Sequence, residues 1–218
     1  MSNKVVLVVG AGPGVGASVA RRYGAAGYDV ALVARSTERL GELGRSLQAD
    51  GVTTGWTAVD ITDTDAFADA VTRFGRFADR IDVLHFNPSA FRQQDPLTLT
   101  ARDLLADVHL GAASLLTAVQ AARPFMSAGA RITATGSMAA DQPWHEAASL
   151  GVQKAALRNL LLSLDTTLAP SGIRAMSLTV KGTLAAEGRF TPDLVAEALF
   201  RAAQTPDADW RPEVSYDG

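Results

Sequence analysis

A strand of the buried type runs directly into a glycine-rich turn at the amino end of the chain, and this junction restricts the fold more than any other feature. Residues 5–9 are all valine or leucine, and an apolar run without alternation is typical of a parallel sheet covered on both faces. Glycine permits positive φ and close approach to a ligand, and the N–H groups at a helix start favour phosphate. The sequence therefore predicts a dinucleotide-binding loop rather than an ordinary tight turn, formed by Gly10, Gly12, Pro13, Gly14, Val15 and Gly16.

Apolar, β-branched runs recur along the chain, and each is followed by a helical period. Strands are predicted over residues 5–9, 29–33, 52–59, 81–86, 131–135 and 173–179. Helices are predicted over residues 14–24, 101–126, 147–168 and 194–203. Two more helices are indicated by capping residues followed by an apolar stripe: Ser36 and Thr37 with Leu40, Leu43 and Leu47, and Thr62 and Asp65 with Phe67, Val71 and Phe74. A polar tail follows. This alternation predicts an α/β, doubly wound parallel sheet, the Rossmann fold, with helices on both faces.

Length and composition exclude several classes of protein. The 218 residues contain no linker, so one NAD(P)-binding domain over residues 1–218 is expected. A net charge of −3 without a basic block offers no surface for nucleic acid. Cysteine is absent, and His85, His109 and His145 are too far apart in sequence to predict a metal site. The first apolar run is too short for a membrane span and lacks the cleavage region of a signal peptide, so the cytoplasm is the expected location.

The end of the second strand indicates which dinucleotide is preferred. In folds of this kind an acidic residue there binds both ribose hydroxyls and repels a 2′-phosphate. Here the strand ends in Ala34-Arg35-Ser36, without a carboxylate. A guanidinium can pair a phosphate through two parallel hydrogen bonds. Arg35 and Ser36 therefore predict NADP in preference to NAD, the alternative being a solvated arginine at a helix start.

Several motifs together resemble the short-chain dehydrogenase/reductase family over nearly the whole chain. Its Gly-x-x-x-Gly-x-Gly loop is matched by Gly10, Gly14 and Gly16. Asp60-Ile61 resembles the acidic–aliphatic pair that contacts adenine, and Asn87-Pro88 stands where the fourth strand of relatives ends in Asn-Asn-Ala-Gly. These positions are accordingly expected to contact the cofactor.

The catalytic part of the resemblance is incomplete. The family implies hydride transfer between a nicotinamide and an alcohol or carbonyl, with a serine on the reacting oxygen and a tyrosine that moves the proton. Its lysine binds the nicotinamide ribose and lowers the pKa of that tyrosine. Ser137 and Lys154 match the serine and the lysine, but Leu150 stands four residues before Lys154, where the tyrosine is expected. The chain is therefore identified as an atypical member without the active-site tyrosine.

Another proton donor has to be considered, because leucine has no labile proton. His145 lies between Ser137 and the helix of Lys154, and an imidazole titrates near physiological pH. We therefore predict His145 as a candidate acid, with a surface or substrate-contact role as the alternative. Only eight residues, 184–191, lie between Thr183 and the start of the last helix at Pro192. A segment this short leaves the pocket open or closed by a partner subunit.

Two functions remain open at this stage. One is an NADP-dependent oxidoreductase acting on a small carbonyl or alcohol with an atypical donor, His145 or water. The other is a catalytically degenerate NADP(H)-binding protein that senses redox state or pairs with an active relative. A non-redox lyase or methyltransferase is a weaker third reading. The resemblance also implies a homodimer or homotetramer, formed through the long central helices.

Overall fold

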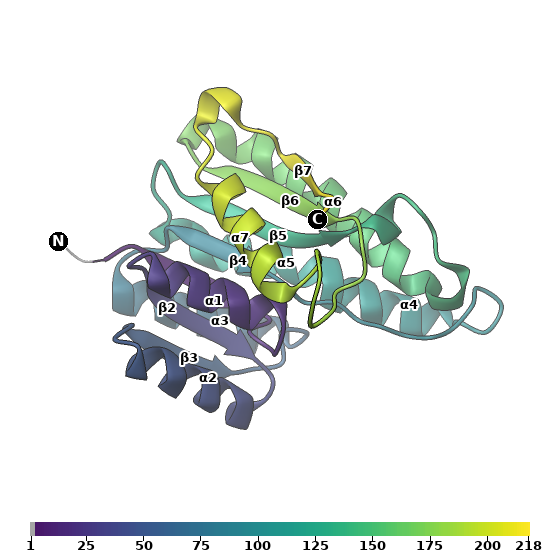
Figure 1. Cartoon of the computed structure of the whole chain (residues 1–218), viewed down its shortest axis with the longest axis horizontal. Helices are drawn as coiled ribbons and strands as arrows, with labels where there is room; N and C mark the ends of the chain where they lie inside the picture. The colour runs from purple at the N-terminus through teal and green to yellow at the C-terminus, as the bar shows by residue number, and fades with distance from the viewer. Residues whose placement is uncertain (1–2) are drawn as a thin grey trace.

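Seven parallel strands form one sheet in the computed structural model, which describes residues 3–218 (Figure 1). The spatial order is β3-β2-β1-β4-β5-β6-β7, and all the ladders between described strands are parallel. The strands are β1 (Val5–Val9), β2 (Asp29–Ala34), β3 (Thr54–Ala58), β4 (Val83–Phe86), β5 (Arg131–Ser137), β6 (Arg174–Val180) and β7 (Glu213–Tyr216). The order reverses at β1, which pairs with β2 on one side and β4 on the other, so a crevice opens at the carboxyl ends of these strands. The predicted doubly wound sheet is confirmed.

Helices cover both faces of the sheet. They are α1 (Val15–Ala25), α2 (Thr37–Ala49), α3 (Thr64–Ala78), α4 (Ala101–Val108), α5 (Ser114–Ala122), α6 (Ala148–Leu168) and α7 (Pro192–Ala203). Leu7 and Val9 of β1 lie in a core shared with α3, α5 and α6, whereas Val6 and Val8 lie in a core shared with α1, α2 and α7. Both faces of β1 are therefore buried, as its unalternating sequence predicts.

Side-chain caps set the starts of several helices. The Ser36 hydroxyl accepts a hydrogen bond from the Arg39 amide at 3.3 Å, as expected for the start of α2. The predicted pair of Thr62 and Asp65 does not cap α3. That helix begins at Thr64, so the carboxylate of Asp63 holds the cap position and accepts from the Ala66 amide at 3.1 Å.

The predicted helix over residues 101–126 is divided in the structure. A π-helical turn, η1 (His109–Ala113), joins α4 to α5, and a 3₁₀ turn that contains Pro124 follows α5. The Gln153 side chain of α6 lies against Gly111, where a Cβ would overlap its amide oxygen. The irregular turn thus lies where α6 packs closely against this helical run.

The same run, residues 101–125, meets the length and composition of a membrane-spanning helix, with a mean hydropathy of 1.4 over a window of 18 residues. Its second half is packed in the protein core, where Leu115, Ala118 and Ala122 have no exposed surface. We interpret it as a core helix, because a buried helix satisfies the same test of composition.

The predicted polar tail contains a seventh strand. β7 pairs in parallel with β6, with Tyr216 opposite Val180. Trp210, just before the strand, is buried in the core between the sheet, α1 and α7. The strand has only four residues and Val214 as its one aliphatic side chain, so its pattern was too short to indicate a strand.

Candidate active site

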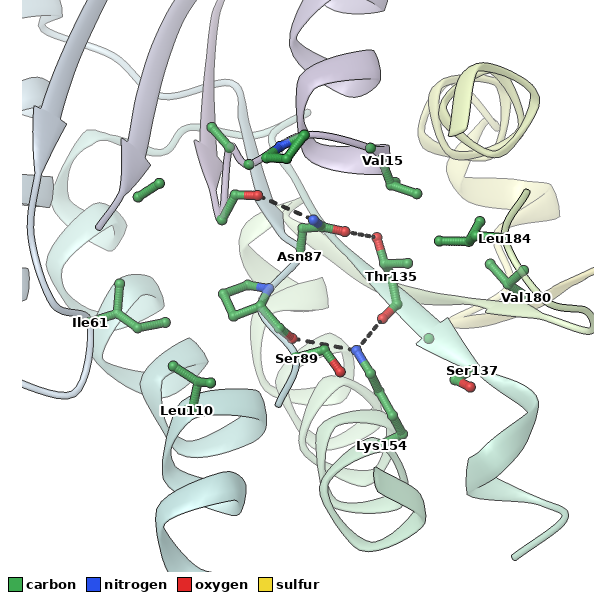
Figure 2. Close-up of a pocket in the computed structure, with 18 of the residues that line it drawn as sticks. Val15, Ile61, Asn87, Ser89, Leu110, Thr135, Ser137, Lys154, Val180 and Leu184 are labelled. Carbon is green, nitrogen blue, oxygen red and sulfur yellow. Dashed lines mark hydrogen bonds between the residues drawn. The ribbon is translucent and has the colours of Figure 1, made fainter. Parts of the chain in front are cut away.

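One cavity of about 620 Å³ lies at the carboxyl ends of the central strands (Figure 2). Its wall includes most of the residues predicted from the sequence, which come from six separate segments of the chain: Gly10, Gly12, Pro13, Gly14, Val15, Arg35, Ser36, Ile61, Asn87, Pro88, Ser137 and Lys154. Three predicted residues, Gly16, Asp60 and His145, are not part of the wall. The topology thus gathers a glycine loop, a cationic segment and two catalytic candidates around one space.

The glycine loop has the backbone that its sequence suggests. Gly10 and Gly14 adopt φ values of 82° and 99°, which side chains disfavour. Gly16 acts by its size, since a Cβ there would overlap the carbonyl oxygen of Gly10. The first turn of α1 has neither a side-chain cap nor an acidic residue. Its N–H groups and its dipole therefore suit the pyrophosphate of a dinucleotide.

The segment from the end of β2 into the first turn of α2 contributes two arginines to the cavity wall. Arg35 and Arg39 both line it, with Ser36 between them. Sequence reasoning did not identify Arg39, although it lies four residues after Arg35, at the first turn of the helix that Ser36 caps. Two cationic side chains without a carboxylate at this strand end can pair with a phosphate group.

Asp60 and Ile61 have different roles in the structure. The Asp60 carboxylate accepts hydrogen bonds from the amide of Thr62 at 3.0 Å and from its hydroxyl at 2.8 Å. These bonds lower the pKa of Asp60 and turn its carboxylate into the loop before α3. Ile61 is buried and lines the cavity, so the apolar member of the pair reaches the predicted adenine end.

Asn87, Thr135 and Lys154 form a hydrogen-bonded group between the glycine loop and α6 (Figure 2). The Asn87 amide donates to the Gly10 carbonyl at 3.2 Å, and the Thr135 hydroxyl donates to Asn87 Oδ1 at 2.8 Å. Lys154 Nζ donates to the carbonyls of Thr135 at 2.9 Å and Pro88 at 3.4 Å. Only 4% of Lys154 is exposed, and burial lowers its pKa to about 8. Lys154 is thus held at the cavity wall and is not a solvated helix lysine.

The α6 end of the cavity combines one hydroxyl with apolar side chains. Ser137, the last residue of β5, lines the cavity, and its hydroxyl oxygen accepts from the Ala139 amide at 3.2 Å. Leu150 lies one helical turn before Lys154 in the same wall. Leu110, Val180 and Leu184 contribute further apolar side chains to the cavity wall.

His145 does not join this group. It lies in an exposed 3₁₀ turn, His145–Ala147, before α6, and it is outside the cavity lining. The structure therefore does not bring the imidazole predicted as a proton donor together with Ser137 and Lys154. The physical reason is local, because the loop after β5 carries His145 on its outer, solvent-facing side.

The short segment before α7, residues 184–191, forms part of the cavity wall. Leu184 lines the cavity, and the Ala185 amide donates to the Phe190 carbonyl at 3.1 Å. The Tyr216 hydroxyl donates to the Arg189 carbonyl at 2.7 Å, so β7 fastens this segment. Its length predicted a pocket that is open or closed by a partner subunit; in the structure, Leu184 of this segment lines the cavity and β7 holds the end of the segment in place.

Comparison with known proteins gives the class of the chain. Residues 4–188 match the model of the family described as short chain dehydrogenase. The chain belongs to the short-chain dehydrogenase family. The family's members are oxidoreductases, and its single Rossmann-like domain is the fold described above.

Relatives of this chain are distant in sequence and close in structure. It is 26% identical to an uncharacterized oxidoreductase of Staphylococcus saprophyticus, over 94% of this chain and 93% of that protein. It is 27% identical to a 3-dehydrosphinganine reductase of Arabidopsis thaliana, over 79% of this chain but only about half, 53%, of the plant protein. A short chain dehydrogenase of Burkholderia cenocepacia, solved in complex with NADP, superposes with a TM-score of 0.89 at 27% identity, covering 100% of this chain and 97% of that one.

Proposed function

We propose that this short-chain dehydrogenase is an NADP-dependent oxidoreductase that transfers hydride between nicotinamide and a small carbonyl or alcohol. The observation that carries the proposal is the continuity of one cavity. At one end lie the glycine loop and the pair Arg35 and Arg39, and at the other end lie Ser137 and Lys154. The NADP complex of the Burkholderia cenocepacia relative and the reductase name of the plant relative support this reading.

The residues of the wall fit an extended dinucleotide. The uncapped amides at the start of α1 suit the pyrophosphate, and the guanidinium groups of Arg35 and Arg39 suit an adenosine 2′-phosphate. Ile61 offers an apolar surface to the adenine, and Lys154 offers N–H groups to the ribose beside the nicotinamide. When bound, NADPH supplies the hydride, and the protein has to orient the carbonyl and provide a proton.

The proton source is the unusual part of the proposal. We place Leu150 at the position of the family's tyrosine, so no phenol is available there. Among the residues that line the cavity, Lys154 alone titrates near neutral pH, since its pKa is lowered to about 8. The Ser137 hydroxyl then donates a hydrogen bond to the carbonyl oxygen, and Lys154 delivers the proton through water and is reprotonated from solvent. His145 remains a testable alternative donor, although its exposed position gives it no contact with the cavity.

Parallel titrations with NADPH and NADH test the cofactor, and NADPH consumption across a panel of small aldehydes and ketones tests the reaction. Tighter binding of NADPH and slow turnover that Ser137→Ala reduces further would support the proposal. Turnover lost in His145→Ala would return the donor role to the imidazole. Tight NADPH binding without turnover would favour the catalytically inactive NADP(H)-binding protein, and absence of NADPH binding would overturn both functions.

We also propose a homodimer or homotetramer for this chain. Leu105 of α4, Leu116 of α5 and Val152 of α6 are exposed by 68%, 40% and 46%. These apolar side chains lie on the long central helices, through which the family is expected to associate. Light scattering after size-exclusion chromatography measures the mass directly. A monomer at micromolar concentration would contradict this part of the proposal.

A further inference from the structure

A buried histidine lies behind the cavity and has no role in the reaction proposed above. His85, in the middle of β4, has no exposed surface. The strand register puts it beside Val8 of β1 on one side and Thr133 of β5 on the other. Its two ring nitrogens lie near two hydroxyls of the same strand, with Nδ1 2.9 Å from Thr133 Oγ1 and Nε2 3.4 Å from Thr135 Oγ1. Because Thr133 and Thr135 are two residues apart, they lie on one face of β5 and flank the ring.

These hydrogen bonds belong to a chain that continues from Thr135 to Asn87 and Gly10. The donor and the acceptor of each bond can be assigned by starting at Gly10. The carbonyl oxygen of Gly10 can only accept, so the Asn87 amide must present its nitrogen there, at 3.2 Å. Asn87 Oδ1 consequently faces Thr135 and receives the one hydroxyl proton of Thr135, at 2.8 Å. A hydroxyl that donates to Asn87 can only accept from His85, so the proton of the ring is on Nε2. The unprotonated Nδ1 then accepts from the Thr133 hydroxyl.

We propose that His85 is a positioning residue for the dinucleotide site. As the neutral Nε2–H tautomer, it holds the Thr135 hydroxyl in the orientation that fixes the Asn87 amide against the glycine loop. The inference rests on the proposed NADP function, since the groups it positions line that cavity. The chain crosses three strands, from Thr133 of β5 through β4 to the carbonyl of Gly10 that follows β1.

Two further observations agree with this assignment. Burial, followed by the nearby charge of Lys154, lowers the pKa of His85 to about 3, so the ring is neutral at physiological pH. Lys154 also donates to the backbone carbonyl of Thr135, at 2.9 Å. Thr135 thus links both halves of the cavity, through its side chain to the glycine loop and through its main chain to the catalytic lysine.

The first test reads the tautomer in the free, wild-type protein. Nitrogen-15 NMR of histidine-labelled protein at neutral pH distinguishes Nε2–H from Nδ1–H, and the doubly substituted His109→Gln, His145→Gln chain identifies the His85 signals. We expect a neutral Nε2–H ring. An Nδ1–H ring or a protonated ring would overturn the inference, whether or not the protein binds NADPH. Failure of the wild-type protein to bind NADPH would instead overturn the proposed function. The NMR result would still decide the tautomer of His85 and the directions of its hydrogen bonds.

The second test separates positioning from general stability. Thr135→Val removes the hydroxyl with little change of shape, and we expect about tenfold weaker NADPH binding, with Thr135→Ser restoring it to within about twofold. Thr133→Val is the matched control on the same strand face. It removes a buried hydrogen bond of the same ring and lowers the melting temperature similarly, yet should change NADPH affinity by no more than about twofold. Equal losses of affinity in Thr133→Val and Thr135→Val would show general loosening and refute a positioning role.

Substitution of the ring itself completes the test. His85→Gln retains one donor and one acceptor for the two threonines, whereas His85→Leu retains neither. We expect NADPH affinity near that of the wild type for His85→Gln and about tenfold weaker for His85→Leu. Unchanged affinity in His85→Leu would contradict the proposal. Should His85→Leu not fold, the pair Thr135→Val and Thr135→Ser decides the question.

Discussion

The glycine-loop end and the α6 end of the cavity differ in how far they follow the pattern of their family. At the first end, Gly10, Gly14 and Gly16 occupy the expected loop positions, and two arginines line the wall beside it. At the second end, the serine and the lysine are in place, but Leu150 lies where a proton-transferring phenol is expected. The two ends come from separate segments of the chain. In the function that we propose, cofactor binding is therefore kept while the proton-transfer chemistry differs.

The largest expected effect is a gain of activity at the α6 end. Leu150→Tyr places a phenol in the cavity wall one turn before Lys154, and general acid catalysis contributes about 10²- to 10⁴-fold. We expect carbonyl reduction with NADPH to rise by about 10²-fold or more, measured as kcat. Leu150→Phe is the control, since it has the ring without the proton. An equal rise in Leu150→Phe would show that ring packing, not proton transfer, limits the rate.

At the glycine-loop end, Gly16→Val should abolish cofactor binding. Its Cβ would overlap the Gly10 carbonyl, so the loop must move away from the phosphate position. We expect NADPH affinity to fall by at least about 100-fold, as a displacement of the amides removes several charge-assisted hydrogen bonds. Calorimetric titration measures it, with Gly55→Ala in β3 as a control whose Cβ would make an ordinary contact with Phe74. Retained NADPH affinity in Gly16→Val would place the phosphates elsewhere.

The arginine pair should determine which cofactor is preferred. Replacing Arg35 and Arg39 together with alanine removes the cationic groups for a 2′-phosphate, and each hydrogen bond to a charged group contributes about 1.5–3 kcal/mol. We expect NADPH binding to weaken about 10- to 100-fold and NADH binding to change little. Arg45→Ala, an exposed arginine of the same helix outside the cavity lining, should leave the ratio unchanged. Equal losses of affinity for NADPH and NADH would contradict recognition of the 2′-phosphate by these arginines.

The smallest effect lies between the two ends, at His85. The pKa of the folded-state ring is lowered to about 3, mainly by burial, whereas an unfolded histidine titrates near 6.5. Below pH 6.5, the imidazole of His85 is therefore mostly protonated in the unfolded chain and neutral in the folded chain. The free energy of unfolding should fall as pH decreases from 6.5 to 5, approaching about 1.4 kcal/mol per pH unit.

Urea unfolding at pH 6.5, 6.0, 5.5 and 5.0 measures this slope. This window lies above the range in which most carboxylates titrate. His85→Gln should flatten the slope, while the doubly substituted His109→Gln, His145→Gln chain should keep it. A slope that His85→Gln leaves unchanged would mean that another group accounts for the acid sensitivity.

The candidate site divides into parts that the sequence predicts and parts that it does not. The glycine loop and Arg35 could be placed because they follow strands whose apolar pattern is strong, whereas Ile61, Ser137 and Lys154 were placed by their resemblance to motifs of the family. Arg39 and Thr135 were missed, since a residue one turn into a helix or inside a buried strand has no local signal for a ligand.

The sequence alone determined the parallel sheet, the two helical layers and the nucleotide-binding loop, because apolar periodicity and glycine conformation are local properties. Only the tertiary structure decided that β7 completes the sheet and holds the segment of Leu184, and that a π-helical turn at His109–Ala113 interrupts the long helix. It also decided that His145 faces solvent and that His85, Thr135 and Asn87 form one hydrogen-bond chain. These features depend on packing between residues far apart in the sequence, 50 positions for His85 and Thr135, and no short stretch of sequence carries that information.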